Sequence, residues 1–171
     1  WSNYSWFVGD IFGAPLAIEG IVAFFMESTF IGVMFFGWDK VGRGFHLAST
    51  WLTGIGATLS AWWILVANSW MQHPVGMELN PLTVRSEMTD FFAVAFAPEA
   101  AMKFLHTVSS GWLTGAVFVV AVSSWFLLRG RNGRTAMASM RIAAVTGLVS
   151  GLIVMGTGDQ SGVNIAKGQP M

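Results

Sequence analysis

Four long apolar stretches constrain this sequence more than any other feature. They cover about residues 11–37, 45–70, 99–128 and 136–155. A helix needs about 20 mostly apolar residues to cross the hydrocarbon core of a membrane, at a rise of about 1.5 Å per residue, and each stretch is long enough. Pro15 and Pro98 suit helix first turns. The sequence therefore predicts an all-α, polytopic transmembrane helix bundle with four spanning helices in a single membrane domain, residues 1–171.

The composition also favours a membrane protein. Only 11% of the residues are charged, whereas an average soluble domain carries about 25%. Nine basic residues balance nine acidic ones, so no basic field attracts nucleic acid. The chain contains no cysteine, which excludes a disulfide, a thiolate metal ligand and a cysteine nucleophile within it. The 14 Phe and nine Trp residues suit contact with lipid and with a flat cofactor.

Basic residues between the stretches predict their orientation. They are Lys40 and Arg43 after the first stretch, and Arg129, Arg131 and Arg134 after the third. Loops rich in Lys and Arg stay in the cytoplasm, so we expect these two turns on the cytoplasmic side. The N-terminus, the loop 71–97 and the C-terminus then lie outside. The loop 71–97 is too long for a simple turn, and we expect it to hold a short helix.

Two carboxylates, Glu19 and Glu27, interrupt the first apolar stretch. A carboxylate at membrane depth is costly, so such groups usually face a bundle interior and mark a pathway. Eight residues of α-helix give about 12 Å of rise and roughly 80° of rotation. Both side chains are therefore expected on one broad face, with Glu19 nearer the outside. The pair is typical of a proton relay or of a carboxylate that meets a metal, and a structural pair bonded to a neighbouring helix is the alternative.

One histidine, His106, lies well inside a predicted span, and Lys103 precedes it by one turn. An imidazole that faces a bundle core can ligate haem, carry a proton or form only a structural hydrogen bond. Lys103 can extend to the membrane interface, or it can pair with a haem propionate or another anion. We expect His46 at the interface and His73 in the outer loop. This chain then cannot supply both axial ligands of a bis-histidine haem.

Longer motifs follow one another along the chain. They are Gly-Asp-Ile-Phe-Gly-Ala-Pro-Leu-Ala-Ile-Glu-Gly at 9–20, Phe-Phe-Met-Glu-Ser-Thr-Phe-Ile-Gly at 24–32, Phe-Gly-Trp-Asp at 36–39, the run 59–74, Lys-Phe-Leu-His-Thr-Val-Ser at 103–109 and Gly-Asp-Gln-Ser-Gly at 158–162. Taken alone, the last run predicts a tight polar turn after the fourth span. Together and in this order, the motifs closely resemble subunit I of cytochrome bd quinol oxidases over the whole length of the chain.

The resemblance implies roles for four residues. His106, in Lys-Phe-x-His-Thr-Val, matches the histidine that ligates the iron of the low-spin haem b558. Glu19, in Ile-Glu-Gly, matches the carboxylate associated with the haem d iron. Glu27, in Glu-Ser-Thr, matches the glutamate of the proton path from the cytoplasm. Lys103 matches a lysine near haem b558.

The resemblance also implies a terminal quinol oxidase of a prokaryotic inner membrane. Such an enzyme oxidises quinol at its outer face, passes electrons through haems b558 and b595 to haem d, and reduces O2 to water with cytoplasmic protons. The implied partners are subunit II, small accessory subunits, quinol, O2 and membrane lipid, and no nucleic acid. Because the chain begins at Trp1 and has four spans, we expect a fragment without the N-terminal region, the quinol-binding loop and the C-terminal half, inactive alone.

Two other classes of protein stay open from the residues alone. A proton-coupled membrane transporter would use Glu19 and Glu27 as coupling acids. A structural membrane subunit would hold no cofactor, and its polar side chains would serve only helix packing.

Overall fold

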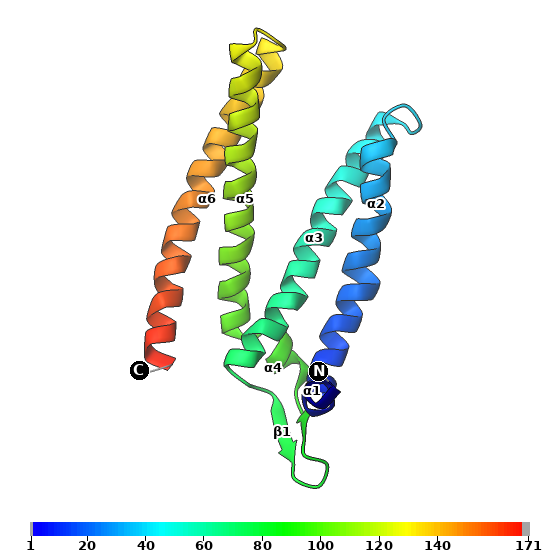
Figure 1. The fold of residues 1–171 in the computed structure, drawn as a ribbon, viewed down its shortest axis with the longest axis vertical. Coiled ribbons are helices and arrows are strands. Elements are labelled where there is room, and N and C mark those ends of the chain that lie inside the picture. Colours follow the sequence, from blue (N-terminus) through cyan, green and yellow to red (C-terminus); the bar gives the residue numbers. More distant parts are fainter. Residues whose placement is uncertain (1, 169–171) are drawn as a thin grey trace. The chain divides into compact units, whose positions relative to one another are not determined.

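The structure, a computed structural model, describes residues 2–168. Its elements are α1 (Ser2–Ile18), the π-helical segment η1 (Glu19–Phe24), α2 (Phe25–Phe36), α3 (Arg43–Gln72), β1 (Met77–Asn80), β2 (Arg85–Met88), α4 (Phe91–Ala95), α5 (Pro98–Leu128) and α6 (Gly133–Gly168) (Figure 1). Four helical stretches are long and apolar enough to cross a membrane: Ser2–Phe36, Arg43–Gln72, Phe91–Leu128 and Gly133–Lys167. The third of them consists of α4 and α5, which are separated by Phe96 and Ala97. The predicted all-α transmembrane fold with four spanning helices is therefore confirmed.

Tertiary contacts divide the chain between Ala101 and Met102 into two units, which are described separately. In the first unit, α1, η1 and α2 follow one another without a break. Figure 1 shows α1 nearly end-on at the foot of the rising η1 and α2, so the helical stretch bends between them. Pro15 and the π-helical segment lie in this region, and both features are recognised causes of helix kinks.

The buried core of the first unit lies where α1 meets the end of α3, α4 and the start of α5. The Phe12 and Trp70 rings pack nearly perpendicular to each other, with 5.3 Å between ring centroids. Burial of such apolar side chains supplies most of the stability of a folded unit. The buried members of this cluster are Val8, Ile11, Val66, Trp70, Val94, Ala97 and Ala100.

The loop between the second and third spans contains an antiparallel hairpin, which the sequence analysis did not predict. Met77 pairs with Met88 in its register. Gly76 has a φ of +62°, and a Cβ there would lie 2.6 Å from the carbonyl oxygen of Asp90, so the position requires glycine. Asp90 then caps α4 by accepting a 3.0 Å hydrogen bond from the backbone N–H of Ala93. The short helix expected in this loop is α4.

In the second unit, α5 and α6 pack against each other where small residues face the partner helix. A Cβ on Gly147 would lie 3.2 Å from Cβ of Ala116, which is the close approach expected of small residues in membrane helices. The predicted helix end at 155 and the predicted turn at 158–162 are wrong, because α6 continues to Gly168. Thr157 is buried in this extension, and its packing outweighs the low helix propensity of the flanking glycines.

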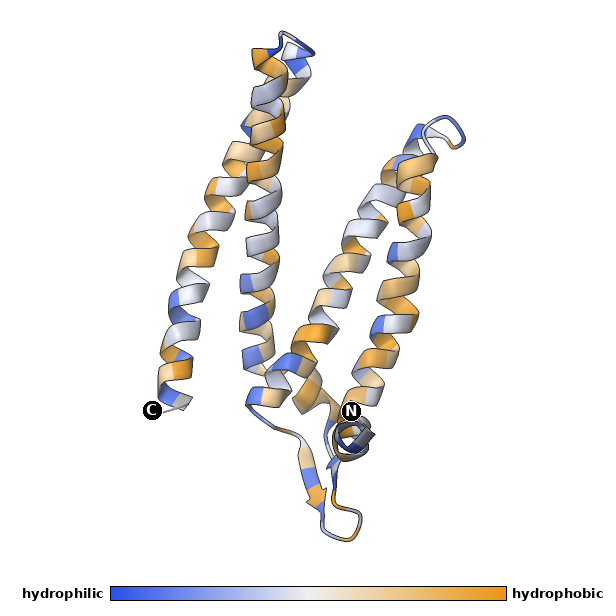
Figure 2. Ribbon diagram, in the orientation of Figure 1, coloured by the Kyte–Doolittle hydropathy of each residue, from blue (hydrophilic) through white to orange (hydrophobic). Residues whose placement is uncertain are grey.

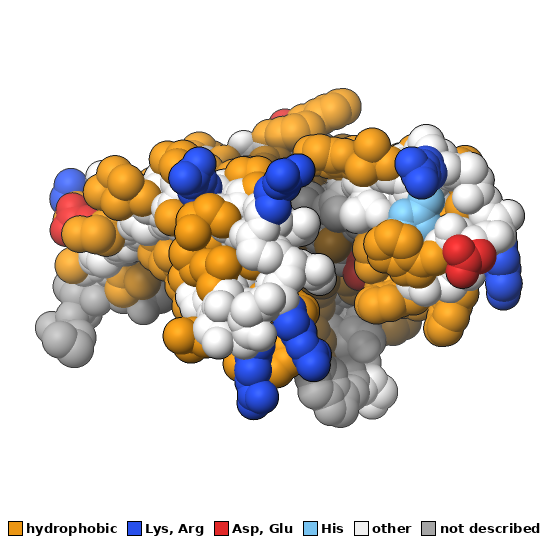
Figure 3. Space-filling view, turned by 90° about the horizontal axis from the view of Figure 1, so that it is seen from above, with side chains coloured by type: hydrophobic (Ala, Val, Ile, Leu, Met, Phe, Trp, Pro, Cys, Tyr) orange, Lys and Arg blue, Asp and Glu red, His pale blue; other side chains and the backbone are white. Residues whose placement is uncertain are grey.

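Large apolar side chains remain on the surface of the spanning helices. Phe36 is 75% exposed and Leu148 is 68% exposed. Figure 2 shows apolar residues along the lengths of the helices and hydrophilic residues at the α2–α3 and α5–α6 turns. Lys and Arg side chains project at these turns (Figure 3). This distribution suits helices that contact lipid or other membrane segments.

Candidate functional site

Glu19, on the first span, is hydrogen-bonded to a side chain of the second span. Ser60, on α3, donates from Oγ to Glu19 Oε1 at 2.7 Å, and both side chains are half-buried. The two residues are 41 positions apart in the sequence. A carboxylate and a hydroxyl in such contact can pass a proton between them.

The π-helical segment η1 begins at Glu19 and ends at Phe24, so it lies between Glu19 and Glu27. π-Helical turns are rare and occur frequently at functional sites. The rotation of roughly 80° expected between the two carboxylates assumes an uninterrupted α-helix, and therefore it does not apply here. The sequence contains no local signal for this segment.

Glu27 is half-buried on α2. Within residues 2–168 no side chain forms a hydrogen bond with its carboxylate. The neighbouring Ser28 donates to the carbonyl oxygen of Phe25 in its own helix, at 3.3 Å. The structure thus brings Glu19 together with Ser60, but it provides no such partner for Glu27 in the part of the chain that it describes.

α3 approaches the backbone of the first span closely at the level of Glu27. A Cβ on Gly56 would lie 3.1 Å from the backbone nitrogen of Glu27 and 3.2 Å from the carbonyl oxygen of Ala23. Gly56 and Ala23 are both buried. Because Gly56 has no side chain, α3 can approach the first span closely. This position therefore sets the spacing between the helix that carries Ser60 and the helical stretch that carries the two glutamates.

His106, on α5, faces α6. Its Nδ1 lies 2.9 Å from Oγ1 of Thr157, and the position of a Cβ on Gly158 would be 3.4 Å from its Cε1. The Thr157 hydroxyl donates to the carbonyl oxygen of Ile153 at 2.8 Å. The direction of the contact with His106 depends on the imidazole tautomer: when the single hydroxyl proton of Thr157 is on Ile153, Nδ1–H is the donor. Nε2 is then the unprotonated nitrogen.

This tautomer fits the donor set of a haem site. Iron is bound by a neutral imidazole nitrogen, while the other ring N–H is held by a protein oxygen. No hydrogen bond involves Nε2 of His106 in residues 2–168. Clusters of three or more His, Cys, Asp or Glu side chains, which could hold a bare metal ion, are also absent from these residues. An imidazole whose second ring nitrogen has a protein oxygen as partner is a suitable iron ligand, so His106 could supply one ligand to a haem.

The other residues singled out from the sequence lie elsewhere. Lys103 is half-buried on α5, one turn before His106. His46 lies at the start of α3, where its Nε2 is 3.0 Å from the carbonyl oxygen of Met34 and its ring is tilted against that of Trp38, with 4.4 Å between ring centroids. His73 is exposed at the end of α3.

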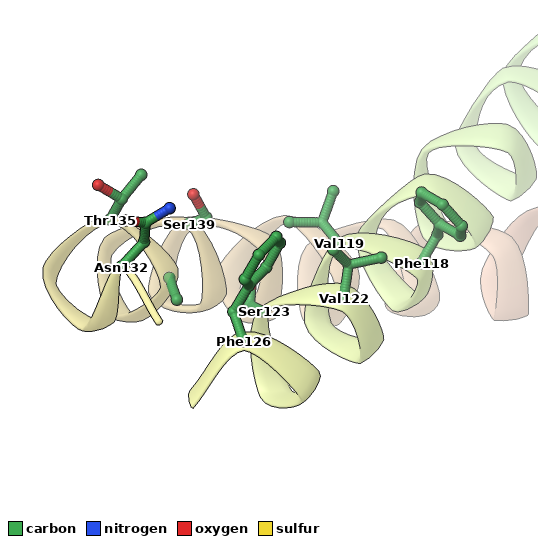
Figure 4. Close-up of a pocket in the computed structure, with 9 residues that line it drawn as sticks. Phe118, Val119, Val122, Ser123, Phe126, Asn132, Thr135 and Ser139 are labelled. Carbon is green, nitrogen blue, oxygen red and sulfur yellow. The ribbon is translucent and has the colours of Figure 1, made fainter. Parts of the chain in front are cut away.

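Three hollows in the structure lie away from Glu19, Glu27 and His106. Two are between α5 and α6, have volumes of about 230 and 320 Å³, and contain no titratable side chain. The first is formed mainly by valine, phenylalanine, serine and threonine side chains near the α5–α6 turn (Figure 4). The third, of about 910 Å³, lies at the α2–α3 turn beside Arg43 and His46. None of them is lined by Glu19, Glu27 or His106.

Sequence reasoning missed Ser60 and Thr157. Ser60 stands in an apolar run, between Leu59 and Ala61, where a lone hydroxyl is a weak signal. Thr157 stands between two glycines that indicate a helix end. Both residues act through contacts 41 and 51 positions away.

The whole chain, residues 1–171, matches the family described as cytochrome bd terminal oxidase subunit I. It is 48% identical over 171 residues to "Cytochrome bd-II ubiquinol oxidase subunit 1" of Escherichia coli (strain K12). It is 43% identical over 171 residues to "Cytochrome bd ubiquinol oxidase subunit 1" of Bacillus subtilis (strain 168). Both alignments cover the whole of this chain. They cover 33% of the Escherichia coli protein and 36% of the Bacillus subtilis protein.

The fold is similar to a solved structure, that of the bd oxidase from Geobacillus thermodenitrificans, with a TM-score of 0.83 and 26% sequence identity. That comparison covers 99% of this chain and 39% of the other. This chain spans about a third of the length of the curated relatives that it matches. The match over every residue, with the multi-pass helical fold, is decisive: the chain belongs to the cytochrome bd terminal oxidase subunit I family.

Proposed function

We propose that this chain is part of the haem-containing subunit of a terminal quinol oxidase, a quinol:oxygen oxidoreductase of the respiratory chain. Its relatives carry the name ubiquinol oxidase subunit 1. The single observation that carries the proposal is the His106 imidazole of a spanning helix, which contacts Thr157 at Nδ1 and has no hydrogen bond at Nε2 within residues 2–168. A transporter that uses only carboxylates has no need of this arrangement.

When bound, the haems b558, b595 and d supply one-electron chemistry between quinol and O2. Within this chain, His106 would hold the iron of haem b558 through Nε2. Lys103, one turn away, would pair with an anionic group of that haem, such as a propionate. Glu19 would be the carboxylate beside haem d. This assignment of Glu19 rests on its position in the family motif and on its place at the start of a π-helical segment.

Glu27, Ser60 and Glu19 form the proton path in this proposal. Glu27 takes up a proton arriving from the cytoplasm. Water carries it on, because no side-chain hydrogen bond links Glu27 to Ser60 or Glu19 within residues 2–168. Ser60 donates its hydroxyl proton to Oε1 of Glu19 along the 2.7 Å hydrogen bond as its Oγ accepts a proton from that water, so no alkoxide forms. The path would therefore deliver protons to Glu19.

The proposal places the α2–α3 and α5–α6 turns in the cytoplasm, because Lys and Arg residues gather there. The hairpin, α4 and the C-terminal end of α6 then lie on the outer side. The complete enzyme contains cytochrome bd subunit II, small accessory subunits and surrounding lipid, and it takes quinol and O2 as substrates. This arrangement separates charge because quinol releases protons outside while water formation uses protons from inside.

An optical spectrum tests the proposal. The complete complex that contains this chain should show b- and d-type haem bands in a reduced-minus-oxidised difference spectrum. His106→Ala should remove the low-spin b band, whereas His73→Ala, at an exposed histidine, should keep every band. Absence of haem bands from the intact complex would favour a proton-coupled transporter. A full low-spin b band in His106→Ala would refute the ligand assignment.

A further inference from the structure

The His106 imidazole is held by a single side chain of the opposing helix. Nδ1 of His106 lies 2.9 Å from Oγ1 of Thr157, and Thr157 is only 7% exposed. Ser110, one turn from His106, donates instead to the backbone carbonyl of His106 at 2.7 Å. The ring orientation therefore depends on α6 and not on the local helix.

The direction of this hydrogen bond follows from the second contact of Thr157. Its hydroxyl donates to the carbonyl oxygen of Ile153 at 2.8 Å, one turn earlier in α6. This back-bonding is common for threonine in helices, and it leaves only the oxygen lone pairs for His106. Nδ1–H donates to Thr157, and Nε2 keeps its lone pair.

The uninterrupted course of α6 makes this contact possible. Gly156, Thr157 and Gly158 are helical, so Thr157 projects from a regular turn toward α5. Gly158 leaves room for the ring, since a Cβ there would lie 3.4 Å from Cε1 and 3.9 Å from Nδ1 of His106. Thr157 and Gly158 thus both lie against the Nδ1–Cε1 edge of the imidazole.

We propose that Thr157 is a positioning residue that fixes the tautomer and orientation of His106 and lowers the reduction potential of the haem bound there. The inference rests on the proposed function, in which His106 ligates that haem. A protein oxygen that accepts the second ring N–H of a ligating histidine makes the imidazole a stronger donor to the metal. A stronger donor favours ferric over ferrous iron, so loss of the Thr157 hydroxyl should raise the potential.

The test uses the complete holo-complex with Thr157→Val, which removes the hydroxyl and keeps the shape of the side chain. We expect the ferrous form of the low-spin b haem to be favoured up to about tenfold, equivalent to about 59 mV for a one-electron couple. Redox titration of its optical band measures the shift, and its electron paramagnetic resonance signal should change as well. Thr157→Ser, which keeps the hydroxyl, should restore the native potential.

Thr146→Val is the matched control, because Thr146 is an exposed threonine of the same helix. It should leave the potential unchanged. A native potential in Thr157→Val overturns the inference, as does an equal shift in Thr157→Ser, which would assign the effect to packing. If Thr157→Val does not assemble, Thr157→Ala is judged by the same criterion. Two different variants therefore test the two proposals. The Thr157 variants keep the low-spin band and test only its potential. The proposed function fails if His106→Ala keeps that band.

Discussion

The hydroxyl of Ser60 on α3 donates a 2.7 Å hydrogen bond to Oε1 of Glu19 at the first residue of the π-helical segment η1. The bond joins two spanning helices through the one carboxylate of the first span that has a side-chain partner within residues 2–168. A hydroxyl that donates to a carboxylate can both orient it and hand it a proton. The two roles have different consequences when the hydroxyl is removed.

Ser60→Ala tests the relay role. We expect the rate of quinol-dependent oxygen consumption by the complete complex to fall about tenfold, since water can replace part of a missing hydroxyl relay. The haem bands should keep their intensities. Thr58→Ala is the control, because Thr58 donates only to the carbonyl oxygen of Gly54 in its own helix. Equal rates in Ser60→Ala and the native complex would leave Ser60 with a packing role alone.

Glu27→Gln removes a group that can take up a proton and keeps its size. We expect oxygen consumption to fall on the order of 100-fold, the usual range for loss of an acid-base group, while the low-spin b band stays at full strength. Glu78→Gln, at an exposed carboxylate of β1, should have the native rate. An unchanged rate of oxygen consumption in Glu27→Gln would show that this carboxylate has only a structural role.

The spanning helices could be predicted because their apolar length is a local property of the sequence. The predicted end of the third span at 128 agrees with α5. The end of the fourth could not be located in the same way, because glycines favour a helix end locally while packing of Thr157 against α5 keeps α6 helical. The π-helical segment at Glu19 likewise has no local signature.

Residue type was enough to single out Glu19, Glu27 and His106 as candidates, since ionisable groups are rare in apolar runs. Their partners could not be predicted. Ser60 and Thr157 reach Glu19 and His106 across 41 and 51 positions of sequence, and only tertiary packing brings them together. A serine or threonine inside a membrane helix most often bonds to its own backbone, so its type alone carries little information.

Gly56→Ala tests the close approach of α3 to the first span. The new methyl group would lie 3.1 to 3.2 Å from backbone atoms of Glu27 and Ala23, and backbone cannot easily move away. We expect a loss of about 1–3 kcal/mol in stability from overpacking, measured as a lower unfolding temperature of the complex. Gly54→Ala is the control, because a Cβ there meets nothing within 4 Å. Equal unfolding temperatures would show that the helices can separate at no cost.

Asp10→Ala tests how the hairpin is held against α1. Asp10 Oδ2 accepts a 2.8 Å hydrogen bond from the backbone N–H of Met88. Arg85 donates to the carbonyl oxygen of Trp6 at 3.1 Å, and its guanidinium lies 4.7 Å from the Trp6 ring centroid. Because Asp10 is exposed, we expect a local loss of only about 1 kcal/mol. Hydrogen exchange should become several-fold faster in residues 77–88 and stay unchanged in α6.

Orientation in the membrane can be tested with engineered cysteines, since this chain contains none. The two substitutions are Arg131→Cys and Glu78→Cys. Arg131 lies in the α5–α6 turn, and Glu78 lies in β1. In a complex without other cysteines, a membrane-impermeant maleimide should label Arg131→Cys only in inside-out vesicles and Glu78→Cys only in intact cells or right-side-out vesicles. The reason is the retention of Lys- and Arg-rich turns in the cytoplasm. The reverse pattern would invert the orientation, and with it the direction of the proposed proton path from Glu27 to Glu19.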